Sequence, residues 1–194
     1  MRYFWIVCFT TLLLTQNVSA LEESTIEPFM KKNIEVVASI IRDKALKEDI
    51  KTTKIFSIFD QVFDYTTMSR ISLGSAKWKE LNKSQQDEFS MAFEKKLKNS
   101  YINKLNLYTD EKIVLGNMQK INNTRIQLLM TLFKNNEKYE VIYKFYKTNN
   151  NEWLIYDVDV LGVSIIQTYK IQFAEFLQKE PFEKLIEKLK SKES

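Results

Sequence analysis

Residues 153–173 read WLIYDVDVLGVSIIQTYKIQF and join a strand pattern to a helix pattern. Apolar residues alternate in the first part, which is the period of a strand with one buried face. The face expected to turn toward the core carries Leu154, Tyr156, Val158 and Val160. The opposite face carries Ile155, Asp157 and Asp159. Gly162 interrupts the strand and Ser164 can cap the helix that follows, so this helix must pack against its own sheet.

The rest of the chain divides into a helical part and a strand part near residue 110. Apolar stripes at helical spacing predict helices over residues 24–46, 53–63, 65–73 and 84–107. Alternating residues then predict strands over 112–118, 124–133 and 139–146, separated by Asn-rich turns. Short connections make these strands and the one from residue 153 an antiparallel meander. With helices from residues 164 and 181, the predicted fold class is α+β, with a twisted four-stranded sheet between N-terminal and C-terminal helices.

Residues 1–20 have the pattern of a cleaved signal peptide. Arg2 supplies a positive charge, residues 3–14 form an apolar run, and residues 18–20 (VSA) suit a small-residue cleavage site. An uncleaved anchor is the alternative, but the apolar run is shorter than the roughly 20 residues that span a bilayer. Cleavage would leave residues 21–194 as a single exported, soluble domain.

Composition limits the chemistry that this chain can perform. The 194 residues contain no His, and the single cysteine, Cys8, lies inside the expected leader. Catalytic triads with His, Cys–His dyads and zinc sites of Cys and His are therefore excluded. The net charge of +4 falls to +3 when Arg2 is removed, and the lysines are interleaved with acids, so nucleic-acid binding is not favoured. We expect no catalytic residues, no metal and no cofactor.

Asp157 and Asp159 allow two interpretations. Two residues apart on a strand, they share a face, as an acid/base pair in a small enzyme would. Alternatively, Asp157 accepts hydrogen bonds from the backbone, or from a Tyr or Ser near the following helix, because a buried carboxylate needs partners. The second interpretation is favoured, because no third polar group completes a catalytic site.

The predicted second and third strands carry apolar residues on both faces. In residues 124–133, Leu129 and Phe133 lie on the face opposite the main apolar row. In residues 139–146, Ile142 and Tyr146 lie opposite the main apolar row in the same way. A sheet covered by helices on one face normally has polar residues on the other. The pattern fits an ordinary core with a covered second face, or a cavity between sheet and helices that takes an apolar ligand.

Three groups of residues, spread over residues 59–189, share their spacing with one known family. The C-terminal group is Trp153, Tyr156-Asp157-Val158, Gly162-Val163-Ser164, Tyr169 and Phe173. The central group is Phe63-Asp64-Tyr65, Met68, Leu73-Gly74 and Trp78. The third is Ser84-Gln85-Gln86-Asp87-Glu88-Phe89, Phe93, Leu97 and Tyr101. In this order they resemble the MlaC, or toluene-tolerance, family of periplasmic phospholipid-binding proteins.

The resemblance implies a carrier that shuttles phospholipid between the outer and inner membranes and so maintains the lipid asymmetry of the outer membrane. The lipid tails would lie in an apolar cavity between sheet and helices, with the headgroup in solvent, and the lipid would be cargo rather than cofactor. The implied partners are an inner-membrane complex of an MCE-domain protein with an ABC transporter, and an outer-membrane lipoprotein complex. We expect a monomer. A carrier does no covalent chemistry, which suits a chain without His.

The resemblance and the apolar periodicity together predict the side chains that line this cavity. They are Met68, Leu73, Phe89, Phe93, Leu97, Tyr101, Leu128, Met130, Tyr143, Phe145, Val158, Val160, Val163 and Ile166. Two other classes of function stay open: a small isomerase-like enzyme that uses Asp157 and Asp159, and a structural adaptor without a ligand. The enzyme needs a carboxylate in the cavity, whereas the alternation places both on the face opposite Val158 and Val160.

Overall fold

The computed structural model of the chain describes residues 21–105, 112–134 and 137–191, and for residues 101–105 it describes the backbone only. The expected leader, residues 1–20, and the side chain of Tyr101 lie outside the described residues. Helices come first, after the 3-10 turn η1 (Glu23–Thr25): α1 (Ile26–Arg42), α2 (Glu48–Phe59), α3 (Tyr65–Leu73), α4 (Ser75–Glu80) and α5 (Lys83–Leu105). The sheet follows with β1 (Lys112–Asn122), β2 (Arg125–Lys134), β3 (Glu137–Lys147), β4 (Trp153–Val160) and β5 (Val163–Ser164), before α6 (Ile165–Leu177) and α7 (Phe182–Lys190).

This order confirms the predicted α+β class. The strands form one open sheet in the order β1-β2-β3-β4-β5, and every neighbouring pair is antiparallel. The prediction of four strands missed β5, because a strand of two residues carries no periodic signal. The first predicted helix was too long: α1 ends at Arg42, and the Asp43 side chain accepts a hydrogen bond from the Ala45 N–H at 2.9 Å, a local turn that competes with the helix.

A β-bulge in β4 changes which of its residues face the core. Phe145 of β3 pairs with Ile155, but the preceding Lys144 pairs with Asp157. Tyr156 is therefore an extra residue on β4, with two residues opposite one on the neighbouring strand. An extra residue shifts the alternation of side chains by one position, so the two halves of β4 follow different phases.

The bulge overturns part of the predicted face assignment. The prediction turned Leu154 and Tyr156 toward the core, but Trp153 and Ile155 are the residues buried there. Beyond the bulge the predicted phase is correct, and Val158 is buried in the same cluster. A strict period of two cannot reveal a bulge, because the inserted residue looks like any other position in the pattern.

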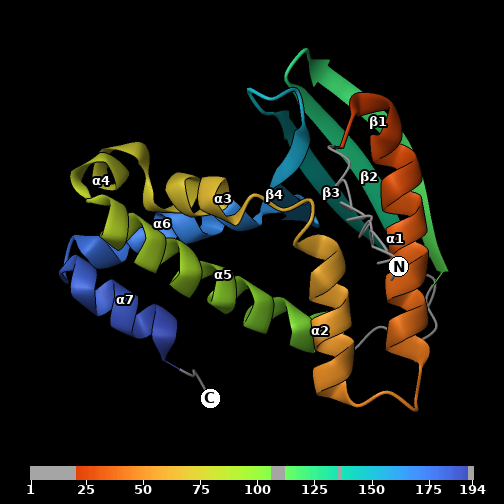
Figure 1. Ribbon diagram of the computed structural model, residues 1–194, viewed down its shortest axis with the longest axis horizontal. Coiled ribbons are helices and arrows are strands. Elements are labelled where there is room, and N and C mark those ends of the chain that lie inside the picture. Colours follow the sequence, from red (N-terminus) through yellow and green to blue (C-terminus); the bar gives the residue numbers. More distant parts are fainter. Residues whose placement is uncertain (1–20, 106–111, 135–136, 192–194) are drawn as a thin grey trace, which may run out of the picture.

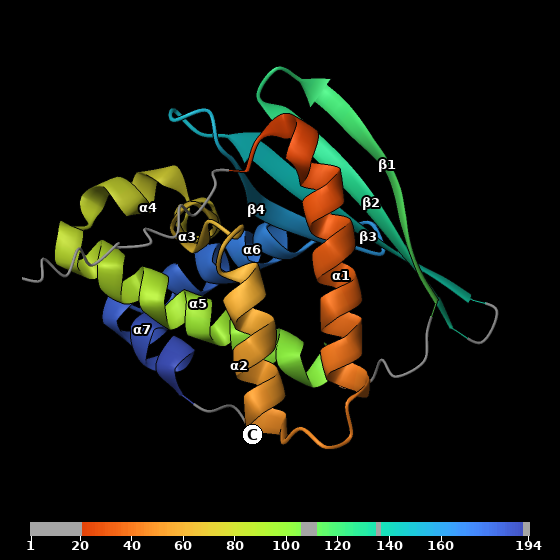
Figure 2. The ribbon, with the colours of Figure 1, turned by 45° about the vertical axis from the view of Figure 1, so that its right-hand side comes forward.

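The helices divide into two groups around the sheet. Helix α1 crosses the face of β1, β2 and β3, whereas α3, α5, α6 and α7 gather beyond β4 (Figure 1). After a turn of the view, α2 stands beside α1, and α5 extends past α2 (Figure 2). Lys98 of α5 forms an ion pair with Asp60, the residue after α2, at 2.7 Å, which fixes the end of α2 against α5.

Most buried apolar side chains form two clusters that correspond to these groups, and Val37, Ile55 and Leu132 belong to neither. The sheet cluster consists of Leu21, Ile26, Met30, Val62, Ile126, Leu128, Met130, Tyr143, Phe145, Trp153, Ile155 and Val158. The helix cluster consists of Met68, Leu73, Leu81, Phe89, Ala92, Phe93, Leu97, Ile166, Phe173, Phe182, Leu185, Ile186 and Leu189. Phe63 and Ile165 pack against both clusters and so join the two halves of the core.

Candidate functional site

One end of the sheet face that carries the sheet cluster is fully buried. Ile126, Phe145 and Ile155 pair in register as a row across β2, β3 and β4, and Phe145 and Ile155 are 0% exposed. The start of α1 lies at this end, since Lys120, which pairs with Ile126, forms an ion pair with Glu23 at 2.9 Å. This end of the face is closed core.

Further along the same face the outer strands β1 and β4 are less covered, whereas β2 stays buried, with Leu132 of the row beyond 6% exposed. Two rows further along, Met130, Val141 and Val160 pair in register, and Leu115 of β1 pairs with Met130. Met130 is 9% exposed and Val160 is 36% exposed, while Leu115 and Val141 are half-buried. We call these four residues the open row. Aliphatic side chains left partly exposed beside a closed core mark this end as the candidate binding surface.

Four other half-buried apolar side chains lie around the sheet cluster. They pack against the sheet cluster from α1 and β1, and they are Phe29, Ile34, Ile113 and Met118. The sequence-based lining did not include them or Leu115. The apolar stripe of α1 and the alternation in residues 112–118 carried the signal, but neither pattern distinguishes a wall of a site from ordinary core.

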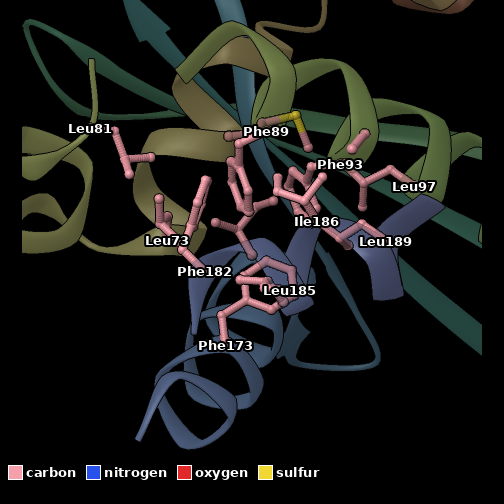
Figure 3. Close-up of a cluster of buried hydrophobic side chains, with 13 residues drawn as sticks. Leu73, Leu81, Phe89, Phe93, Leu97, Phe173, Phe182, Leu185, Ile186 and Leu189 are labelled. Carbon is pink, nitrogen blue, oxygen red and sulfur yellow. The ribbon is translucent and has the colours of Figure 1, made fainter. Parts of the chain in front are cut away.

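The helix cluster is closed by aromatic contacts. Phe93 is 0% exposed, and its ring lies 5.0 Å from that of Tyr169 and 5.5 Å from that of Phe173. Phe89 is also 0% exposed and lies 6.0 Å from Phe182 of α7. Figure 3 shows these side chains of α5 pointing toward those of α6 and α7. Edge-to-face and tilted ring pairs of this kind fix the packing of the three helices.

The structure divides the predicted lining residues between the two clusters. The sheet cluster contains Leu128, Met130, Tyr143, Phe145 and Val158. The helix cluster contains Met68, Leu73, Phe89, Phe93, Leu97 and Ile166. Val160 and Val163 are exposed at the turn between β4 and β5, and the side chain of Tyr101 lies outside the described residues. The predicted residues thus fall in two clusters, and those on the sheet lie nearest the open row.

Tyr143 is the one predicted lining residue with a hydroxyl among those described. Its side chain is buried in the sheet cluster, and its hydroxyl lies 3.8 Å from the sulfur of Met130. Burial raises the pKa of Tyr143 to about 12, because the phenolate would lose its hydration. The residue is therefore neutral at physiological pH and contributes apolar surface to this part of the face.

The Asp157 carboxylate is a structural acceptor on the opposite face. It accepts hydrogen bonds from the Ser164 hydroxyl at 2.7 Å, from the Val158 N–H at 2.8 Å and from the Ile166 N–H at 3.2 Å. Lys144 donates to Asp157 at 3.1 Å. The interpretation in which Asp157 holds the helix that follows is confirmed.

Asp159 belongs to the same polar group. Its carboxylate lies 2.6 Å from the Lys144 ammonium, so this one lysine forms ion pairs with both Asp157 and Asp159. Burial acts to lower the pKa of Lys144, but the hydrogen bonds to Asp159 and Asp157 outweigh burial, and the pKa is raised. Both carboxylates lie on the face away from the open row, so the geometry does not support an acid/base pair in the candidate site.

A second polar contact joins α3 to the sheet. The Asp64 carboxylate caps α3 by accepting from the Thr67 N–H at 2.8 Å, and it also accepts from the Tyr146 hydroxyl of β3. Burial and this hydrogen bond raise the pKa of Tyr146. Asp64 therefore both caps α3 and ties it to β3.

Two classes of feature are not found among the described residues. Within residues 21–105, 112–134 and 137–191, no three His, Cys, Asp or Glu side chains come together as a metal site would require. In the same ranges, none of the helices combines the length and the apolar character that crossing a bilayer demands.

Comparisons with known proteins place this geometry in a family. A phospholipid-binding protein of Ralstonia solanacearum, solved in complex with a phospholipid, has a similar fold: the TM-score is 0.71 at 21% identity, over 84% of this chain and 93% of that one. No curated protein matches the chain. The sequence profile described as MlaC protein matches residues 31–191, which cover the helix cluster, the whole sheet and all of the sheet cluster except Leu21, Ile26 and Met30. The chain therefore belongs to the MlaC family.

Proposed function

We propose that this protein is a soluble periplasmic carrier that moves phospholipid between the outer and inner membranes and thereby maintains the lipid asymmetry of the outer membrane. The observation that carries the proposal is a partly exposed apolar row beside a closed core on one face of the sheet: Phe145 of β3 is 0% exposed and Val160 of β4 is 36% exposed. The acyl tails lie along this face and the headgroup lies toward solvent.

The energetics of the lipid explain why a carrier is needed. A diacyl lipid has roughly 30 methylenes, and each costs about 0.8 kcal/mol in water, so transfer of a free lipid through water costs on the order of 20 kcal/mol. Inside a bilayer these methylenes are likewise kept out of water. The apolar face must therefore hold the lipid about as favourably as a bilayer does. Contacts with partner complexes must then shift the balance toward loading or release of the lipid.

The lining that we propose centres on the sheet. The floor consists of Leu128, Met130, Tyr143 and Val158, with the open row at its less buried end and the closed row of Phe145 at its other end. Half-buried side chains of α1 and β1 form the sides. The predicted residues of the helix cluster, such as Phe89 and Phe93, adjoin the sheet cluster through Ile165 and Phe63, which contact both clusters.

The partners and the location follow from the same proposal. The carrier acts as a monomer, receives or delivers lipid at an outer-membrane lipoprotein complex, and exchanges it with an inner-membrane complex of an MCE-domain protein and an ABC transporter. Export uses residues 1–20 as a cleaved signal peptide. The acid/base enzyme is not proposed, since Lys144 already binds both Asp157 and Asp159.

The test is native mass spectrometry of the protein purified from a Gram-negative periplasm, followed by lipid extraction under denaturing conditions. We expect a mass shift that corresponds to bound phospholipid and an N-terminus at Leu21. A second arm incubates delipidated protein with phospholipid vesicles and a donor complex. Protein that is empty after purification and stays empty in the second arm would exclude the carrier function.

A further inference from the structure

The turn between β4 and β5 presents three large aliphatic side chains to solvent. Val160 pairs with Val163, so Leu161 and Gly162 form a two-residue hairpin turn. Val160 is 36% exposed, Leu161 57% and Val163 60%. We call residues 160–163 the apolar tip. The tip carries no charge and no hydrogen-bonding side chain.

The amino acid at the first turn position is not one that the turn itself favours. Leu161 has φ of 53° and Gly162 has φ of 79°. Two successive positive φ angles characterise the hairpin turns in which Asn, Asp or Gly is preferred at the first position. Leucine in this conformation brings its Cβ close to the carbonyl that follows, which costs roughly 1 kcal/mol. An exposed leucine that strains its own turn and packs against little has no evident structural purpose.

The tip is nevertheless held in place. The Leu161 N–H donates to the Glu140 carbonyl at 2.9 Å, which fixes the turn to the start of β3. Ser164, directly after the tip, donates to Asp157 at 2.7 Å. The aliphatic side chains therefore project from a fixed backbone.

The tip is also continuous with the proposed lipid-binding floor. Val160 is the last residue of the open row, and Val141 and Met130 are its neighbours across β3 and β2. Apolar surface thus extends from the buried floor to the exposed end of the hairpin. A lipid tail at the tip could reach the floor over aliphatic side chains.

We infer that the apolar tip inserts into the acyl layer of a phospholipid bilayer and places the open row at the membrane surface. The composition favours a bilayer over a protein, because residues that dominate protein interfaces are Trp, Tyr and Arg, while Leu and Val are under-represented among them. The size of the tip also favours a bilayer. Three side chains bury far less area than the roughly 800 Å² per partner of a stable protein interface, whereas insertion into lipid has no such minimum. This inference deepens the proposed function and relies on it for its biological purpose.

Sedimentation with sucrose-loaded phosphatidylcholine vesicles tests the inference. We expect the wild-type protein to bind these neutral vesicles, with little change at roughly 0.5 M salt, where exposed charges are screened within a few ångströms. Leu161→Asp should lower the bound-to-free ratio by about tenfold or more, since it replaces buried aliphatic surface with a charge that resists leaving water. Wild-type protein that stays in the supernatant would overturn the inference.

Leu161→Asn separates a membrane role from a structural one. Asparagine suits the positive φ, so the melting temperature should stay the same or rise, while vesicle binding should fall. The matched control is Ile171→Asn on α6, because Ile171 is 60% exposed but lies outside the tip. Equal binding by wild type and Leu161→Asn, or equal loss in both variants, would refute insertion of the tip. Lipid extraction from the same proteins tests the carrier function separately, since a variant can hold its lipid without binding vesicles.

Discussion

The Ser164 hydroxyl donates to the Asp157 carboxylate at 2.7 Å and at the same time accepts from the Gln167 N–H at 3.0 Å. This pair of bonds connects β4 to the first turn of α6. Because Ile165 packs against both clusters, the position of α6 decides how the helical half of the core meets the sheet. A carboxylate on the outer face of the sheet therefore sets the geometry of the apolar surface on the other face.

The first prediction concerns Asp157→Asn. The amide keeps one acceptor but loses the charge, so the hydrogen bonds from Ser164 and the ion pair with Lys144 are weakened in a buried site. We expect the free energy of unfolding to fall by about 2–4 kcal/mol, as for other buried charged networks from which one partner is removed. Urea unfolding followed by circular dichroism measures this change.

Glu80→Gln is the control for that experiment. Glu80 forms an ion pair with Lys77 on the surface of α4 at 3.0 Å, and exposed pairs of this kind contribute little. The control should unfold at the wild-type urea concentration. If both variants lost the same stability, the special role of the buried network would be refuted.

The second prediction concerns alkaline pH. The pKa of Tyr143 is raised by burial to about 12, above the value of 10 in an unfolded chain. Between these two values the folded state holds a proton that the unfolded state releases, so stability is complete below pH 10 and is lost as pH rises toward 12. The loss from this one residue should reach about 3 kcal/mol.

Tyr143→Phe isolates that contribution. The variant has no proton to release at this position, so its unfolding free energy should fall less steeply than that of the wild type between pH 10 and pH 12. Urea titrations at several pH values give the two slopes. Parallel curves for wild type and variant would show that Tyr143 ionises as easily in the folded state as in the unfolded chain.

The third prediction separates the helix cluster from the proposed lipid-binding surface. Phe93→Ala removes a ring that is 0% exposed and contacts Tyr169 and Phe173, so stability should fall by about 3–5 kcal/mol. The folded fraction should nevertheless keep the wild-type amount of bound phospholipid per chain, as measured by native mass spectrometry. A folded variant without lipid would instead place Phe93 in the lining, as the sequence alone suggested.

The sequence predicts the overall organisation well because each long element repeats a strong period. The alternation in residues 124–133 and 139–146 places Met130 and Tyr143 correctly on the inner face, and the alternation from residue 153 places Asp157 and Asp159 correctly on the outer one. The prediction fails where a local insertion breaks the period, as at Tyr156, and where an element is too short to have one, as at β5. The sequence also could not predict how the apolar residues divide into two clusters. Phe89 and Leu128 are both apolar core residues, and only tertiary packing separates them.

The last prediction tests the position of the lipid tails. Leu115→Trp adds bulk to a half-buried side chain of the open row, which should fill part of the proposed binding surface and lower the phospholipid content severalfold. Val114→Trp is the matched control, because Val114 is the preceding residue on the same edge strand, projects from the opposite face and is 39% exposed. Both substitutions should leave the melting temperature within a few degrees of wild type, since neither residue is fully buried. Native mass spectrometry would then show less lipid for Leu115→Trp only; equal lipid content in the two variants would mean that the tails do not lie along the open row.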